Sequence, residues 1–174
     1  MKFISIINKF SKSPTEVNML QLISFIESRK IHNEEIALLA ETLATSGEKL
    51  NINKNISTAD IPSTGGPSSL TTILCPLYLV HFGYVVPKLG IPGSPAGGVD
   101  ILAQIPGYKV HFMKEDFESL LSKHNYIHSL ADENFCPLDN TLFKFRKKVG
   151  KVSVFPLVIA SLLSKKIALG VKNV

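Results

Sequence analysis

A short loop of hydroxyl and glycine residues is the first feature of the chain that predicts ligand chemistry. It is Ser63-Thr64-Gly65-Gly66, and four of the five residues at 68–72 are also Ser or Thr. Two adjacent glycines let backbone N–H groups approach a ligand, and the hydroxyl groups add further donors. Apolar residues at helical spacing follow up to Gly83, so we expect the loop to open a helix N-terminus, where phosphate binds favourably. An ordinary Ser/Gly turn is the alternative interpretation of so short a motif.

Three polar residues near the end of the sequence form a second set of candidate donors. Ser161 and Lys165 are four residues apart, so on a helix they share one face, and Arg146 lies in the basic segment before them. A hydroxyl, an ammonium and a guanidinium suit a ligand rich in carbonyl acceptors, such as a pyrimidine base. The alternative is that the two cations are surface charges and Ser161 is a small packing residue.

Length and composition predict one domain without a membrane segment. The chain has 174 residues, of which 45% are hydrophobic and 19% are charged, and its mean hydropathy is +0.20. The best apolar candidate, residues 155–163, contains Pro156 and is followed by Lys165 and Lys166, and the N-terminal residues lack the pattern of a secretory signal. We therefore expect a cytoplasmic protein whose apolar excess meets a partner.

The charge pattern does not favour nucleic-acid binding. The formal net charge of +5 suits phosphorylated ligands, but the dense basic run at 146–151 lacks the interleaved aromatic residues of a nucleic-acid surface. The five histidines show no metal-ligand spacing, although His111 and His128 fall in neighbouring predicted strands, and the two cysteines form no CxxC motif. We expect no nucleic-acid partner, no metal and no cofactor.

The elements that must position these residues alternate between helix and strand after a helical N-terminal part. Helices are predicted at 14–29, with Ser13 as N-cap, and at 34–46. Later elements are helix 68–82, strand 84–86, a short helix before Pro106, strand 108–112, helix 115–123, strand 126–130, helix 137–148, helix 156–169 and an extended end at 171–174. This alternation indicates an α/β fold with a mainly parallel sheet. We expect a helical subdomain at 1–58, joined by the helices of 137–169, and a partial α/β domain at 59–174.

From Asp60 to Val174 the chain resembles the pyrimidine-nucleoside phosphorylases, the thymidine phosphorylase family. The matching segments are, in order, Ile61-Pro62-Ser63-Thr64-Gly65-Gly66, Val86-Pro87-Lys88, Gly97-Gly98 with Asp100, Ile105-Pro106-Gly107, Phe143 to Arg146, Phe155-Pro156-Leu157, Ala160-Ser161 and Ser164-Lys165-Lys166. The resemblance implies the fold of the N-terminal half of such an enzyme and a homodimer formed through the N-terminal helices. It also implies glycosyl transfer between a pyrimidine base or nucleoside and phosphate as co-substrate, with no cofactor.

The resemblance assigns site residues as well. It places the pyrimidine base against Arg146, Ser161 and Lys165. It places phosphate against the loop and the helix that follows, at Ser63, Thr64, Gly65, Gly66 and Thr71.

Two replacements in the loop depart from the family. A lysine that binds phosphate falls on Ile61, and the histidine that is credited with a catalytic role falls on Pro62. Neither replacement has a side chain that donates a hydrogen bond. No catalytic residue is therefore assigned, and because the chain is also short for the family, we expect weak phosphate binding and little or no phosphorolysis.

Two other functions stay open at this stage. Ile61 and Pro62 favour a non-catalytic relative that keeps the fold as a binding or regulatory module. A phosphoribosyltransferase is the second alternative, because the anthranilate phosphoribosyltransferases look similar in fold and also use a threonine-glycine-glycine loop.

Overall fold

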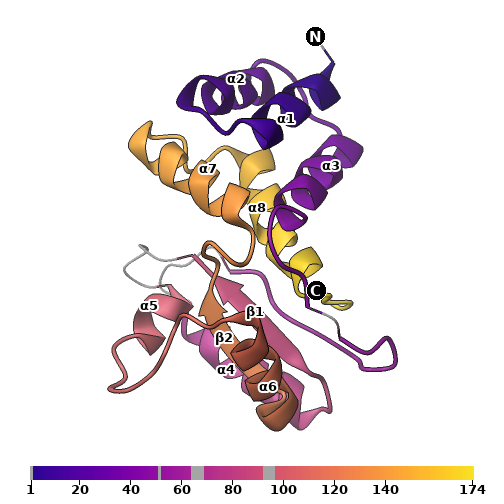
Figure 1. Ribbon diagram of the computed structural model, residues 1–174, viewed down its shortest axis with the longest axis vertical. Coiled ribbons are helices and arrows are strands. Elements are labelled where there is room, and N and C mark those ends of the chain that lie inside the picture. Colours follow the sequence, from indigo (N-terminus) through magenta and orange to yellow (C-terminus); the bar gives the residue numbers. More distant parts are fainter. Residues whose placement is uncertain (1, 51, 64–68, 92–96) are drawn as a thin grey trace.

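The structure, a computed structural model, describes residues 2–50, 52–63, 69–91 and 97–174 (Figure 1). Within these residues it has eight helices and a parallel two-stranded sheet, so the predicted α/β class is confirmed. The elements are α1 (Phe3–Lys12), α2 (Glu16–Glu27), α3 (Asn33–Ala44), α4 (Ser69–His81), β1 (Val86–Gly90), α5 (Gly98–Leu102), α6 (Lys114–His124), β2 (Tyr126–Leu130), α7 (Pro137–Lys148) and α8 (Phe155–Ala168).

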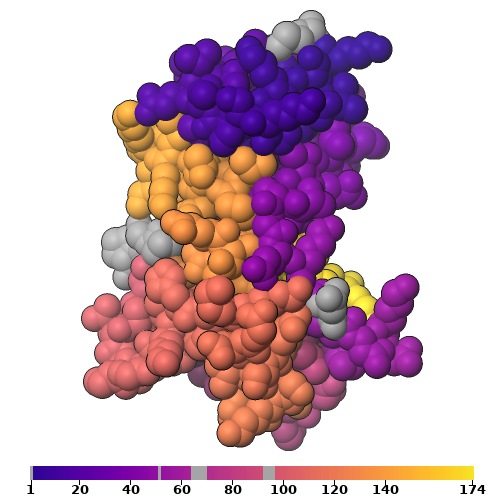
Figure 2. All heavy atoms as spheres, viewed as in Figure 1, coloured from indigo at the N-terminus to yellow at the C-terminus, as the bar shows by residue number. Residues whose placement is uncertain are grey.

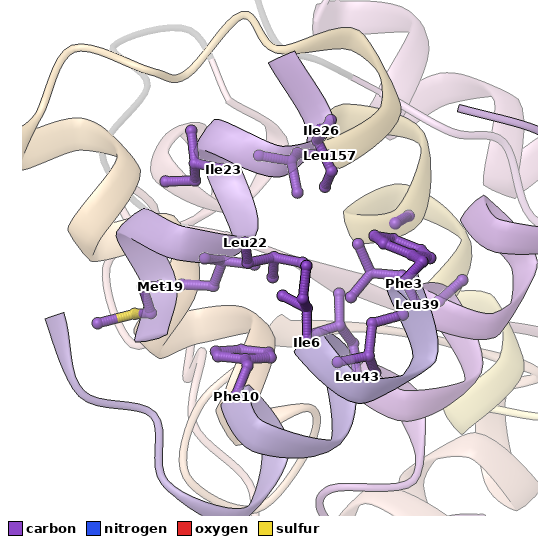
Figure 3. Close-up of a cluster of buried hydrophobic side chains, with 14 of the residues drawn as sticks. Phe3, Ile6, Phe10, Met19, Leu22, Ile23, Ile26, Leu39, Leu43 and Leu157 are labelled. Atoms are coloured by element: carbon purple, nitrogen blue, oxygen red, sulfur yellow. The ribbon is translucent and has the colours of Figure 1, made fainter. Parts of the chain in front are cut away.

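The three N-terminal helices pack with α7 and α8 around the larger apolar core. Helix α3 lies most extensively against α8, although the two are far apart in the sequence. Figure 3 shows side chains from four helices meeting in this core, among them Phe10 of α1, Leu22 of α2, Leu43 of α3 and Leu157 of α8. Burying a side chain of this size contributes about 1.5 to 3 kcal/mol. The helices that contain Arg146 and Lys165 are thus anchored to the N-terminal part.

The sheet has one apolar face and one polar face. In the parallel pairing of β1 with β2, Lys88 lies opposite His128. Successive side chains of a strand point to opposite faces, and Leu89 and Ile127 belong to a second core that includes Phe117 of α6. The face with Lys88 and His128 is therefore the one turned away from α6.

Backbone bridges connect this sheet to distant parts of the chain. Thr58 pairs with Val85, and Ala59 pairs with Asn173, both in parallel orientation. The side chain of Thr58 also donates to the carbonyl of Gly170 at 2.9 Å. These contacts fix the segment that leads into Asp60 beside both β1 and the end of α8.

The local predictions were wrong at four places, one of which is the strand predicted at 84–86, since β1 spans Val86–Gly90. Residues 108–112 form no strand, although the carbonyl of Val110 accepts hydrogen bonds from the end of β2. The second helix begins at Glu16 with Thr15 as its N-cap, because the Thr15 hydroxyl accepts from the Asn18 N–H, whereas Ser13 ends α1. Helix α1 itself was not predicted as a separate element.

The molecule is arranged in three levels along its long axis. Figure 2 shows α1 and α2 at the top, α7 and α3 in the middle, and the region of α5 and α6 at the bottom. No helix within the described residues combines the length and the apolar character needed to cross a membrane.

Candidate functional site

A cavity of about 490 Å³ lies between the polar face of the sheet and helices α7 and α8. Its walls come from α4, β1, β2, the N-terminal end of α5, α7 and α8, and they include Ser63, Arg146, Ser161 and Lys165. The structure thus brings together four of the residues that the sequence analysis selected. A second cavity of similar volume is lined by Ser, Thr, Pro and Leu residues without a charge, so the first cavity is the better candidate for a polar ligand.

Of the residues predicted to bind phosphate, only Ser63 is found in the cavity wall among the described residues. Thr64, Gly65 and Gly66 lie outside the described residues. Thr71 is exposed on α4 and is not part of the cavity wall, whereas its neighbour Thr72 is 4% exposed and does line the cavity. One residue along a helix rotates the side chain by about 100°, which is why neighbouring threonines face different surroundings.

Arg146 is held by the backbone of the loop before α8. Its Nε donates to the carbonyl of Lys151 at 3.1 Å, Nη2 to that of Val152 at 2.5 Å, and Nη1 to that of Leu157 at 3.5 Å. Its exposed fraction is 1%, and burial lowers the pKa of the guanidinium while Asp139 opposes that shift. A guanidinium has five N–H groups, and the described residues accept from three of them.

Ser161 and Lys165 form a buried cluster with Asp139 of α7. Lys165 Nζ lies 2.5 Å from Asp139 Oδ2 and 3.1 Å from Ser161 Oγ, and it also donates to the Ser161 carbonyl. The Ser161 hydroxyl donates to the same Asp139 oxygen at 3.0 Å. All three ammonium N–H groups are therefore engaged within the protein. Lys165 offers a ligand its charge, and a direct hydrogen bond requires one of these contacts to be shared or replaced.

A second buried cluster joins Asp60 to two lysines. Asp60 Oδ1 accepts from Lys88 Nζ at 2.6 Å, and Oδ2 accepts from Lys166 Nζ. Burial, together with the neighbouring lysines, lowers the pKa of Lys166 to about 8, although Asp60 opposes the shift. Lys88 and Lys166 both line the cavity.

His128 lies in the cavity wall next to Lys88. Glycines make room for its ring, since a Cβ atom at Gly98 would lie 2.8 Å from His128 Cε1 and one at Gly90 would lie 3.1 Å from Nε2. Burial, with Lys88 and Lys166 nearby, lowers the pKa of His128 to about 3. The imidazole is therefore neutral at pH 7.

The buried charges around the cavity sum to a positive value. Among the described residues, four buried cations, Lys88, Arg146, Lys165 and Lys166, face two buried carboxylates, Asp60 and Asp139, which leaves two positive charges. Such a site favours an anionic ligand or a ligand on which negative charge develops. Among the described residues, no group of three or more His, Cys, Asp or Glu side chains could hold a metal ion.

The ionic and imidazole partners in this site were not predicted from the sequence: Asp60, Lys88, His128, Asp139 and Lys166. A usable signal was present at two of these positions. Lys88 is the single charged residue of the short strand VPKLG, and His128 lies next to Ser129 in the strand YIHSL. A charged residue inside a buried strand needs a partner, so a lysine at such a position predicts a buried ion pair or a ligand site.

The relatives that the chain matches in sequence are nucleoside phosphorylases. No protein-family model matches the chain. The pyrimidine-nucleoside phosphorylase of Staphylococcus haemolyticus is 32% identical over 144 residues, which are 80% of this chain and 33% of that protein. The pyrimidine-nucleoside phosphorylase of Geobacillus stearothermophilus is 29% identical over 159 residues, covering 89% of this chain and 36% of the relative.

A thymidine phosphorylase shows the widest of these matches along the chain. The protein from Mycoplasma pneumoniae is 26% identical over 171 residues, which are 96% of this chain and 40% of that protein. The chain thus spans about a third of the length of the curated relatives it matches. Over that third, the chain is similar in sequence to the pyrimidine-nucleoside and thymidine phosphorylases.

Proposed function

We propose that the cavity binds a pyrimidine base or nucleoside and serves glycosyl transfer between that base and phosphate. The observation that supports this proposal is the convergence of Arg146, Ser161 and Lys165 on one cavity. A volume of about 490 Å³ suits a ligand of nucleoside size, because small-molecule sites span about 300 to 1,000 Å³. The names of the relatives agree with this ligand class.

In such a transfer the bond between the sugar carbon and the base nitrogen breaks, and a bond to a phosphate oxygen forms. The electron pair of the broken bond leaves with the base, so negative charge develops on the base. The described residues leave two N–H groups of Arg146 for a base carbonyl, and the charge of Lys165 lies in the same cavity wall. Fixed positive groups in a buried site stabilise this charge without reorganisation.

We further propose that this chain alone turns over slowly. Ile61 and Pro62 contribute no proton donor and no side-chain charge to the loop. His128 has a pKa of about 3, so it does not act as a general acid at neutral pH. Binding without efficient phosphorolysis is the result we expect.

Removing the Lys165 ammonium tests the base site. Thymine and uracil are titrated into the wild type and into Lys165→Ala by calorimetry. We expect the affinity to fall about 10- to 100-fold, because interactions with charged groups contribute about 1.5 to 3 kcal/mol. Lys144→Ala, at an exposed position of α7, should leave the affinity unchanged.

Ser161→Ala is the companion variant, because it keeps the ion pair between Lys165 and Asp139. Its loss should be smaller, about 3- to 10-fold. Wild-type protein that binds neither pyrimidine, or an unchanged affinity in folded Lys165→Ala, would contradict the proposed site. Phosphate-dependent release of thymine from thymidine at about one turnover per second or faster would contradict slow turnover.

We also propose a homodimer formed through α1 and α2. Ile4, Val17 and Leu20 are large apolar residues with exposed fractions of 52%, 72% and 50%, and an exposed apolar surface marks an interaction site. In a symmetric contact each substitution acts twice, so Val17→Glu combined with Leu20→Glu should convert the dimer to monomer in sedimentation experiments.

A variant with two exposed apolar residues of α4 replaced by glutamate is the control for the dimer. Leu74→Glu with Leu77→Glu alters positions that are 43% and 52% exposed on another helix. We expect this variant to stay dimeric. A monomeric wild type at micromolar concentration, or dissociation caused by the α4 variant alone, would count against the N-terminal interface.

A further inference from the structure

A buried carboxylate behind the cavity wall contacts two of the residues proposed to hold the base. Asp139, in the first turn of α7, is 1% exposed and is not among the described residues that line the cavity. Its Oδ2 atom accepts from Ser161 Oγ at 3.0 Å and from Lys165 Nζ at 2.5 Å. Its Oδ1 atom has no hydrogen-bond partner within the described part of the chain. Among the described residues, the hydrogen bonds of this carboxylate thus all go to Ser161 and Lys165.

These contacts fix the role of the Ser161 hydroxyl. A carboxylate only accepts hydrogen bonds, and an ammonium only donates them. The one proton of the hydroxyl is therefore donated to Asp139, and Ser161 Oγ accepts from Lys165 Nζ at 3.1 Å. A hydroxyl oxygen has two lone pairs, so one lone pair and no proton is left for a ligand. Because Ser161 lines the cavity, it presents an acceptor to a ligand that binds there.

The cavity wall therefore combines one acceptor with two cationic residues. The described residues leave two N–H groups of Arg146 for a ligand, and Lys165 adds a second positive charge. Uracil and thymine match this set, because each has an N3–H donor between two carbonyl oxygens. Cytosine does not match it, because its N3 is an acceptor and a donating amino group replaces one carbonyl. Two acceptors that face each other leave buried polar groups unsatisfied, which weakens binding.

We propose that Asp139 is a positioning residue, which holds Ser161 as an acceptor and thereby gives the site a preference for a pyrimidine that carries N3–H. Asp139 touches no ligand and acts through Ser161. Its contact with Lys165 holds the ammonium beside the same hydroxyl oxygen. This role rests on the proposed function, because it requires a pyrimidine base beside Ser161.

The affinities of uracil and cytosine, titrated separately by calorimetry, test this role. The wild type should bind uracil about 10-fold or more tightly than cytosine. In Asp139→Asn the amide can donate to Ser161 Oγ, so the hydroxyl proton is free to point to the ligand. We expect the two affinities to come within about 3-fold of each other, mainly through weaker binding of uracil.

Two further comparisons show whether Asp139 acts through Ser161. Asp116→Asn makes the same change in the first turn of α6, at an exposed position, and should keep the wild-type preference. In Ser161→Ala the preference should already be reduced, and adding Asp139→Asn should not reduce it further. A carboxylate with a purely structural role would change the affinity for both bases alike.

A comparison without Lys165 carries the test if Asp139→Asn does not fold. Asp139→Asn leaves the buried ammonium of Lys165 without its counter-charge, which is destabilising. Lys165→Met and the double variant Asp139→Asn with Lys165→Met both lack the ammonium, so they differ only in the partner of the Ser161 hydroxyl. We expect a preference for uracil of about 3- to 10-fold in Lys165→Met and no preference in the double variant.

Failure of this role can be told apart from failure of the proposed function. Wild-type protein that binds uracil and cytosine equally well would overturn the role of Asp139 and leave pyrimidine binding standing. So would a wild-type preference in folded Asp139→Asn, or equal preferences in the two variants that lack Lys165. Wild-type protein that binds neither base would contradict both the role of Asp139 and the proposed function.

Discussion

Replacing Asp60 with asparagine is expected to lower the free energy of unfolding by about 3 to 5 kcal/mol, because it leaves two buried ammonium groups without their counter-charge. The Asp60 carboxylate is completely buried, and Lys88 and Lys166 approach its two oxygens. The expected loss is a large part of the total stability of about 5 to 15 kcal/mol that is typical of a domain. Urea unfolding monitored by circular dichroism measures it.

An exposed ion pair of the same length is the matched control. Lys148 Nζ and Glu16 Oε1 are also 2.6 Å apart, but both side chains are about two thirds exposed. Glu16→Gln should therefore change the free energy of unfolding by less than about 1 kcal/mol. The double variant Asp60→Asn with Lys166→Met should recover part of the loss, because one uncompensated charge is removed. Equal effects of Asp60→Asn and Glu16→Gln would show that burial does not control the energy of the Asp60 cluster.

Elements with a local start signal were predictable from the sequence. Pro137 opens α7 at the residue expected, and β2 spans Tyr126–Leu130 as the apolar pattern indicates. Elements that depend on a distant partner were not. Strand β1 begins at Val86 rather than at residue 84, because its bounds follow from its pairing with β2. The segment 108–112 has a strand pattern, but it contacts β2 irregularly through the Val110 carbonyl and the Tyr108 hydroxyl.

The candidate site also contains residues that were predictable from the sequence and residues that were not. The resemblance selected Arg146, Ser161 and Lys165, which the structure brings together. The ionic partners could not be selected, because the chain brings them together over long separations: Asp60 and Lys166 are 106 residues apart. Nothing in the local sequence at Asp60 predicts two lysines around it. Only the folded arrangement of β1 with α8 defines that charge cluster.

Acid is expected to destabilise the protein through His128, by about 2 to 3 kcal/mol between pH 6.5 and pH 4.5. Burial, with Lys88 and Lys166 nearby, lowers the pKa of His128 to about 3 in the folded state, whereas an unfolded histidine has a pKa of about 6.5. Between these values the unfolded state binds a proton that the folded state excludes. Stability is therefore unaffected by His128 above pH 6.5 and falls as the pH decreases, by about 1.4 kcal/mol for each pH unit.

The difference between wild type and His128→Leu isolates this contribution from that of the carboxylates. Urea unfolding at several pH values should show that the free energy of unfolding falls less steeply with acid in the variant, because leucine has no proton to bind. His124→Gln, at an exposed position of α6, should keep the wild-type slope. Parallel curves for wild type and His128→Leu would mean that the imidazole takes up its proton equally well in both states. In that case the two lysines and the burial at the cavity wall would not control its charge.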